Sequence, residues 1–209
     1  MSEGPQGVSR YTTGARINHW ITAISLVLLA LSGLALFHPS LFFLTHLFGG
    51  GQATRAIHPW IGVVLAVSFL GMFIRFAALN MWNKDDTVWM KNLGKVINNQ
   101  DEGLPELGKY NAGQKLVFWG QSILIVLLFA SGIVLWDVYF EDMTSVDQKR
   151  LAAVAHALCA IGAILIWIVH VYAAIWVKGT LRAMTRGTVS GGWAWKHHRK
   201  WLREETRKS

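Results

Sequence analysis

Four histidines stand at the ends of long apolar segments, where their imidazoles could ligate a metal. His156 and His170 begin and end one such stretch, HALCAIGAILIWIVH, which contains no charged residue. His19 and His58 each open another apolar segment. An ionisable side chain in an apolar span is costly and usually marks a functional position. For any one of them alone, a hydrogen-bonded structural role is the alternative.

The spacing of His156 and His170 places both rings on one side of a helix. Fourteen positions rotate a helix by about 1400°, which is about 40° short of four full turns, and separate the two residues by about 21 Å along the axis. Ala160, Ala163 and Trp167 lie on the same stripe. The two small residues leave room between the histidines for something flat and wide.

Pairing the histidines by depth in the membrane gives His58 with His156 at one surface and His19 with His170 at the other. Each pair could supply both axial nitrogens to an iron, which is the ligation of a b-type haem. The sequence has no C-x-x-C-H motif for covalent attachment. We therefore expect two haem b groups held by ligation and packing.

The remaining histidines and the single cysteine have simpler interpretations. His38 and His46 lie in a predicted outer loop and are expected to be solvated or structural. His197 and His198 lie in a basic tail, where we expect contact with lipid headgroups or a partner and not with a metal. Cys159 is expected to be a small core residue, and one cysteine excludes an internal disulfide and a Cys-rich iron–sulfur motif.

The composition indicates an integral membrane protein. Of the 209 residues, 53% are hydrophobic and only 15% are charged, whereas soluble domains have about 25% charged residues. Four apolar windows reach the ~20 residues that cross a bilayer. We predict one all-α domain, residues 1–209, built as a four-helix membrane bundle of the di-haem cytochrome b type. The predicted spans are 18–37, 58–79, 115–136 and 151–177, followed by a basic tail, 178–209.

The basic residues predict the orientation of these spans. Seventeen of the twenty Lys and Arg residues fall in the N-terminal arm, the middle connection and the tail. By the positive-inside rule both termini are cytoplasmic and the loop near Asp142 lies outside. The net charge of +8 therefore indicates membrane topology, and we expect no nucleic-acid partner.

Several motifs resemble one family closely, with the same spacing over nearly the whole chain. The chain resembles the gamma subunit of respiratory formate dehydrogenase, a membrane cytochrome b, through RINHWITA, IHPWIGVV, GKYNAGQK, HVYAAIWVKGT and WAWKHH. GKYNAGQK and WVKGT are the specific motifs, because hydrogenase and thiosulfate-reductase relatives share a bare four-histidine cytochrome b. The tail departs from the family at HHRKW, where the family usually has proline after the paired histidines.

This resemblance implies a complex in the bacterial inner membrane. An alpha subunit with a molybdenum or tungsten pterin would oxidise formate outside the cytoplasm, and a beta subunit with iron–sulfur clusters would pass the electrons on. The gamma subunit would carry them across the membrane on two b haems to menaquinone or ubiquinone. The family pairs the histidines as the depth argument does. On its own the chain is not expected to be an enzyme, because it contains no evident acid–base pair for formate oxidation.

The resemblance also implies where the quinone binds. By this likeness Asn111, Gly113 and Gln114 line the site, with the ligand His170 beside it. Amide groups can donate to a quinone carbonyl, and glycine allows close approach of the backbone. Alternatively, Asn111 simply caps the third span. Arg16 and Arg75 are candidates for pairing with haem propionates, or for snorkelling to the membrane surface.

Two other functions compete with this interpretation. The first is the cytochrome b of a membrane-bound nickel–iron hydrogenase or a related oxidoreductase. The second is a small transporter or scaffold without a cofactor. A transporter favours polar residues or broken helices near the bilayer midplane, whereas the predicted third and fourth spans are nearly free of charge.

Overall fold

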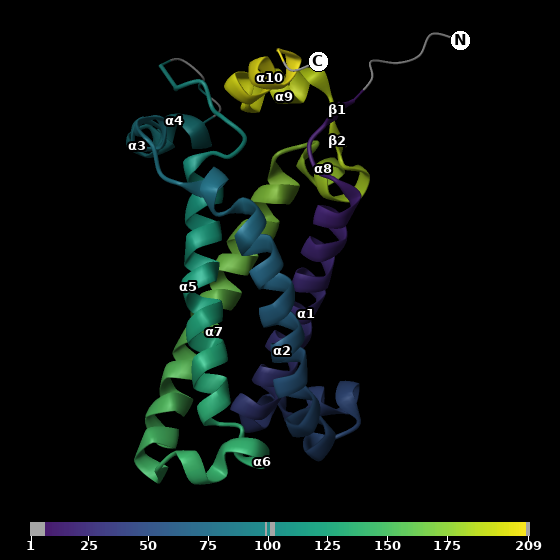
Figure 1. Cartoon of the computed structure of the whole chain (residues 1–209), viewed down its shortest axis with the longest axis vertical. Coiled ribbons are helices and arrows are strands. Elements are labelled where there is room, and N and C mark those ends of the chain that lie inside the picture. The colour runs from purple at the N-terminus through teal and green to yellow at the C-terminus, as the bar shows by residue number, and fades with distance from the viewer. Residues whose placement is uncertain (1–6, 99, 101–102, 208–209) are drawn as a thin grey trace, which may run out of the picture. The chain divides into compact units, whose positions relative to one another are not determined.

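The computed structural model describes residues 7–98, 100 and 103–207 and is predominantly helical (Figure 1). Among these residues, four helices are long and apolar enough to cross a membrane: α1 (Thr13–Phe37), α2 (Gly51–Phe76), α5 (Ala112–Val134) and α7 (Val146–Trp176). This confirms the predicted all-α membrane fold with four spans.

The helix bounds differ from the hydropathy windows in a systematic way. Helix α2 begins at Gly51 and not at His58, and the other three long helices also begin before their predicted spans. Hydropathy detects only the part that lies in hydrocarbon, whereas the backbone keeps its helical hydrogen bonds into the polar interface. At its other end α2 stops at Phe76 and not at Leu79, because Ala78–Asn80 forms a separate 3₁₀ turn, η2.

Short elements connect the long helices. Two 3₁₀ helices besides η2 and six short α-helices are described, and two short strands pair with each other. Their bounds are β1 (Val8–Ser9), η1 (Pro39–Phe48), α3 (Lys84–Lys91), α4 (Leu93–Ile97), α6 (Asp137–Phe140), η3 (Glu141–Met143), α8 (Thr180–Arg186), β2 (Thr188–Val189), α9 (Gly191–His197) and α10 (Arg199–Thr206).

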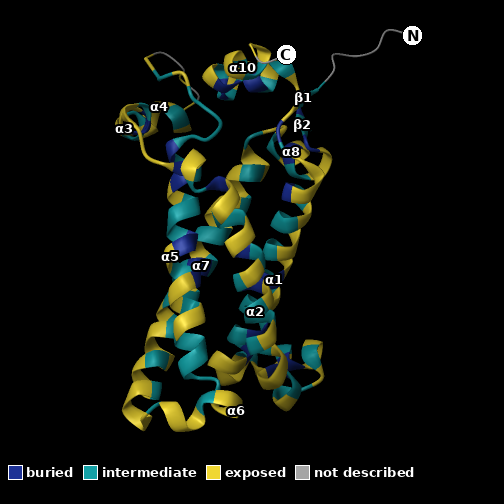
Figure 2. Cartoon of the chain, in the orientation of Figure 1, coloured by how far each residue is buried: buried dark blue, intermediate teal, exposed yellow. Residues whose placement is uncertain are grey.

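The chain forms two compact units. The first, residues 17–74 and 120–168, contains most of the four long helices together with the connections that hold η1, α6 and η3. Leu65, Phe69 and Ile125 are its buried core. Gln121 donates from its amide nitrogen to the Ala163 carbonyl at 2.8 Å, so a polar side chain ties α5 to α7. The outward faces of the helices are exposed and apolar (Figure 2). Such faces suit lipid, which solvates apolar side chains without cost.

The second unit joins the N-terminal arm, residues 75–119 and the chain from residue 169 onward. Strands β1 and β2 pair antiparallel, with Val8 opposite Val189. The carbonyl of Gly187 accepts from the amides of Arg10 and Tyr11 at 2.8 and 3.1 Å. Gly187 has a φ of 79°, and a Cβ there would lie 2.8 Å from the Tyr11 carbonyl oxygen. Glycine is therefore required where the tail turns back along the arm.

Arg10 is a buried cation at the centre of this unit, with an exposed fraction of 4%. Its guanidinium donates to the Lys109 carbonyl at 2.5 Å and lies 3.2 Å from Nε2 of His198. Four aromatic rings surround it at 4.7–6.0 Å, those of Tyr11, Tyr110, Trp193 and Trp201. No described ion pair involves Arg10. Cation–π attraction and hydrogen bonds thus offset the cost of burying this charge.

His198 is part of the same cluster, and the expectation that it contacts lipid or a partner is wrong. Its exposed fraction is 1%. Nδ1 donates to the Gly108 carbonyl at 2.7 Å, which leaves Nε2 to accept from Arg10. Burial, and then the Arg10 charge, lower the pKa of His198 from 6.5 to about 3. The ring is neutral at physiological pH, as its role of acceptor for a guanidinium requires.

This lowered pKa predicts that the second unit loosens in mild acid. Below about pH 6.5 the unfolded chain protonates His198 while the folded chain resists, so stability falls toward pH 3 by up to about 1.4 kcal/mol per pH unit. Hydrogen–deuterium exchange of residues 188–206, corrected for intrinsic rates, should show this between pH 7 and 5. The variant His198→Gln should show a shallower dependence. Equal slopes for the variant and the parent would contradict this account.

Candidate functional site

Two of the four candidate histidines face each other in the first unit. His58 from α2 and His156 from α7 have ring centroids 6.3 Å apart and ring planes inclined by 63°. Both rings are half-buried. The outer pair that depth alone predicts is therefore a pair of neighbouring imidazoles in space.

The distance suits one metal ion held between the two rings. An imidazole nitrogen binds a metal at about 2.0–2.1 Å, and each centroid lies roughly 1 Å behind its nitrogen, so two rings on one ion need about 6 Å between centroids. In the described part of the chain, no three His, Cys, Asp or Glu side chains come together as a metal site. Two protein ligands without a third fit a metal whose other ligands come from a macrocycle, as in haem.

A serine on a neighbouring helix holds each of these rings. Oγ of Ser32 lies 2.7 Å from Nδ1 of His58, and Oγ of Ser131 lies 2.9 Å from Nδ1 of His156. Each hydroxyl donates its single hydrogen to its own helix, at the carbonyls of Leu28 and Leu127 respectively, both at 2.7 Å.

The serine oxygens must therefore accept from the imidazoles. Nδ1 then carries the ring hydrogen in both histidines, and Nε2 keeps a free lone pair. This is the tautomer in which Nε2 can ligate a metal, and a hydrogen bond at the other nitrogen fixes the ring's orientation. Sequence reasoning missed Ser32 and Ser131. The signal was the repeated Ser-Gly pair in LSGLAL and ASGIVL.

The glycine of each pair lies beside the same imidazole. A Cβ on Gly33 would lie 3.5 Å from Cε1 of His58, and a Cβ on Gly132 would lie 3.5 Å from Cε1 of His156. Any side chain larger than methyl would extend into the space around the rings. The two glycines thus keep that space open for a flat ligand.

The other two histidines fall in different units. His19 is the seventh residue of α1, and His170 is the seventh from the end of α7. His19 is half-buried, whereas His170 is exposed. Their pairing stays a prediction from the sequence.

The candidate quinone residues form the first turn of α5, where two of them cap the helix. The Asn111 amide accepts from the backbone of Gln114 at 2.9 Å, and the Gln114 amide accepts from the backbone of Asn111 at 3.0 Å. This reciprocal capping box is the structural role weighed above for Asn111. It uses the amide oxygens, so the amide N–H groups remain as donors for a ligand. Quinone contact stays a prediction.

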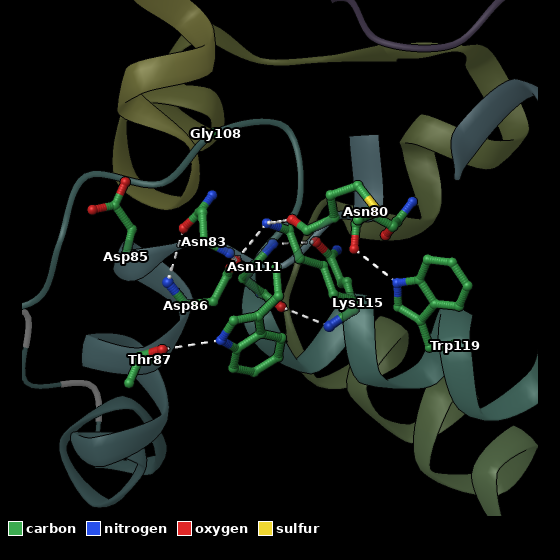
Figure 3. A network of polar contacts seen from close by, with 12 residues as sticks. Asn80, Asn83, Asp85, Asp86, Thr87, Gly108, Asn111, Lys115 and Trp119 are labelled. Carbon is green, nitrogen blue, oxygen red and sulfur yellow. Dashed lines mark hydrogen bonds and ion pairs between the residues drawn. The ribbon is translucent and has the colours of Figure 1, made fainter. Parts of the chain in front are cut away.

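A buried ion pair, Lys115 with Asp86, lies next to this turn (Figure 3). Nζ of Lys115 donates to Asp86 at 2.6 Å and to the Met81 carbonyl at 3.0 Å. The two side chains are 4% and 2% exposed. Asp86 also accepts from the backbone of Asn83 and so caps α3. From hydropathy alone, Lys115 is only the boundary of a span. In the structure its ion pair with Asp86 holds the first turn of α5 next to α3.

The two candidate propionate partners contact protein groups of the second unit. Arg16 donates to the Thr185 carbonyl at 2.5 Å and to the Thr13 hydroxyl at 3.2 Å. Arg75 donates to the Thr12 hydroxyl at 3.3 Å. These bonds agree with arginines that reach the membrane surface, and a role toward propionates stays untested.

Comparison with known sequences points to one family. The pattern of the prokaryotic cytochrome b561 family matches residues 10–187. The chain is 45% identical to the formate dehydrogenase cytochrome b556(fdo) subunit of Escherichia coli K12, over 94% of this chain and 92% of that protein. It is 38% identical to the nitrate-inducible b556(Fdn) subunit of the same strain, over 90% and 87%. It is 35% identical to the formate dehydrogenase cytochrome b556 subunit of Haemophilus influenzae, over 95% and 83%.

The serine contacts predict a measurable effect on haem retention. Ser131→Ala removes the acceptor of the His156 ring hydrogen and should weaken haem binding at this pair by roughly tenfold, since loss of such an outer partner commonly costs 10–100-fold in metal affinity. Haem titration of the apo chain, followed by absorbance, measures this. Ser68→Ala is the matched control, because Ser68 bonds to Thr22 and the Leu65 carbonyl. Equal affinity in both variants would mean that Ser131 does not support the ligand.

Proposed function

The chain belongs to the prokaryotic cytochrome b561 family, among the formate dehydrogenase cytochrome b556 subunits, and we propose that it carries electrons through the membrane from a formate-oxidising partner to a quinone. The observation that carries this proposal is the facing pair His58 and His156, each with Nδ1 bonded to a serine and Nε2 left for iron. A bound haem iron supplies reversible one-electron transfer.

Two haem b groups per chain are proposed, one held by His58 and His156 and one by His19 and His170. The unbroken helix α7 carries one histidine of each pair. Their separation of about 21 Å along the axis covers most of the ~30 Å hydrocarbon core. One helix would thus contribute a ligand to each redox centre.

Quinone reduction is proposed at the turn of α5 that holds Asn111, Gly113 and Gln114, with His170 adjacent. The reaction adds two electrons and two protons to the quinone. Asn111 and Gln114 would direct amide N–H groups at a carbonyl oxygen while their oxygens stay in the capping box. A Cβ on Gly113 would lie 3.4 Å from Asn111 and from Trp89, so a side chain longer than methyl would occupy space beside these residues. Either menaquinone or ubiquinone fits these groups.

The proposed partners are the formate dehydrogenase alpha subunit, with its molybdenum or tungsten pterin, and the iron–sulfur beta subunit. The relatives described above bear formate dehydrogenase names, which favours this complex over a hydrogenase. In the bacterial inner membrane, formate oxidation outside and proton uptake from the cytoplasm would separate charge without proton pumping by this chain. Moving one charge across 100 mV costs about 2.3 kcal/mol, which the electron transfer supplies.

The haem assignment predicts the cofactor content. A pyridine haemochrome assay on the intact chain should give two haems, and His156→Ala should give one, because only the pair with His58 loses a ligand. One haem in the parent protein would contradict the two-centre proposal. Loss of both haems from a folded His156→Ala variant would contradict the pairing.

The quinone assignment predicts a kinetic defect that leaves the haems intact. In the whole complex, Asn111→Asp keeps a capping acceptor but removes the amide donor. Both haems should remain reducible by formate, and reoxidation by added quinone should slow by tenfold or more, measured by stopped-flow absorbance. Asn92→Asp, at the half-buried N-cap of α4 where the side chain makes no capping bond, is the control. Parental reoxidation rates in both Asn111→Asp and Gln114→Glu would place the quinone elsewhere.

The orientation predicts the behaviour of reporter fusions. Both termini are proposed to be cytoplasmic because most basic residues flank that side. A phosphatase that is active only outside the cytoplasm should be silent when fused after Ser209 and active when inserted near Asp142. The reverse pattern would contradict this orientation and would assign the outer histidine pair to the cytoplasmic side.

A further inference from the structure

A basic pocket in the second unit lies apart from the histidine pairs and the α5 turn. It has a volume of about 370 Å³, and its polar lining comes from Lys178, Arg182, Ser190, Trp193, Lys196 and His197. These residues belong to the segment that follows α7, to α8, and to α9 with its N-cap Ser190 (Figure 1). Among the residues that the structure describes, no carboxylate lines the pocket. Cations gathered in this way repel one another unless an anion lies between them.

Three other cations of the tail pair with carboxylates, whereas the cations of the pocket pair with none among the described residues. Arg199 and Arg203 pair with Glu106 at 3.6 and 2.7 Å, and Lys200 pairs with Asp85 at 3.3 Å. Lys178, Arg182 and Lys196 form no ion pair with any carboxylate in the described part of the chain. The cations of α10 are therefore neutralised by carboxylates of the same unit, whereas the cations of the pocket keep their positive charge.

The wall of the pocket is fixed by close packing around Trp193. Gly179 has a φ of 96°, and a Cβ there would lie 2.9 Å from Cδ1 of Trp193. The guanidinium of Arg10 lies 5.0 Å from the centre of the Trp193 ring. Ser190 accepts from the Trp193 backbone at 3.2 Å, so its hydroxyl hydrogen is still available to a ligand. The indole nitrogen of Trp193 is buried without a hydrogen-bond partner among the described groups. The pocket thus combines a closely packed aromatic wall with the donor hydroxyl of Ser190.

The pocket lies where the chain leaves the bilayer. Tyr172 and Trp176 stack at 5.7 Å near the end of α7 and are 61% and 63% exposed. Exposed aromatic residues at a span end mark the level of the lipid headgroups. Lys178 follows Trp176 by two positions, so the first cation of the pocket lies at this level. The anions present there are phosphate groups of lipids and phosphate from solution.

We propose that this pocket binds a phosphate group, held by Lys178, Arg182 and Lys196 against the Trp193 wall. Charge-assisted bonds from lysine and arginine are the usual means of holding phosphate oxygens. The proposal does not depend on the histidine pairs or on a quinone, because none of those residues lines the pocket.

Native mass spectrometry of the full chain in mild detergent, with added dioleoylphosphatidylglycerol, tests the proposal. The triple variant Lys178→Gln, Arg182→Gln, Lys196→Gln should bind the lipid at least about tenfold more weakly than the parent. The matched control removes three cations that are already paired, through Arg199→Gln, Lys200→Gln and Arg203→Gln, and should bind like the parent. Dioleoylglycerol, which has the same tails and no phosphate, should not bind at this site.

Inorganic phosphate at millimolar concentration separates the two sources. Displacement of the lipid by phosphate would identify a site for free phosphate, whereas undiminished lipid binding would identify a headgroup site. Equal loss of binding in the pocket variant and the control, or equal binding of dioleoylglycerol, would overturn the proposal. Circular dichroism checks folding, and if the triple variant unfolds, Arg182→Gln against Arg203→Gln makes the same comparison.

Discussion

Polar groups inside an apolar helix bundle have to be satisfied by other parts of the protein, and this constraint organises the candidate site. Hydrocarbon offers neither donors nor acceptors, so a buried imidazole or hydroxyl costs free energy until it is paired. The hydroxyls of Ser32 and Ser131 each donate a hydrogen bond to a carbonyl of their own helix. Each also accepts a hydrogen bond from a histidine of another long helix. The orientation and tautomer of His58 and His156 are thus set by helices other than their own.

The same arrangement occurs twice. A Ser-Gly pair on α1 contacts the histidine of α2, and a Ser-Gly pair on α5 contacts that of α7. The two helix pairs then present their imidazoles to each other at 6.3 Å. The two facing imidazoles are therefore oriented by two similar local contacts, and in each contact the serine and the histidine satisfy each other's polar groups.

Charges near the ends of the spans are satisfied in two different ways. Lys115 and Asp86 neutralise each other, and each also bonds to backbone, which limits the cost of desolvating both. Arg10 is instead held by aromatic rings, a carbonyl and a neutral histidine. The ion pair of Lys115 and Asp86 positions the turn that carries Asn111 and Gln114. The contacts of Arg10 join the N-terminal arm to the tail and pack against Trp193.

The sequence by itself determined the four spans, the all-α class and the family, because these follow from apolar window length and from motifs with fixed spacing. It also predicted the pair of His58 and His156 from their positions along the helices, and in the structure these two rings are 6.3 Å apart. Only the tertiary structure decided which side chains hold those rings, that His198 is buried, and that Lys115 meets Asp86. These contacts join residues 25 to 188 positions apart, and no local pattern encodes them. Long-range contacts depend on how the helices pack against one another. The length of a span and the face of the helix on which a residue lies depend only on the order of residues along the chain.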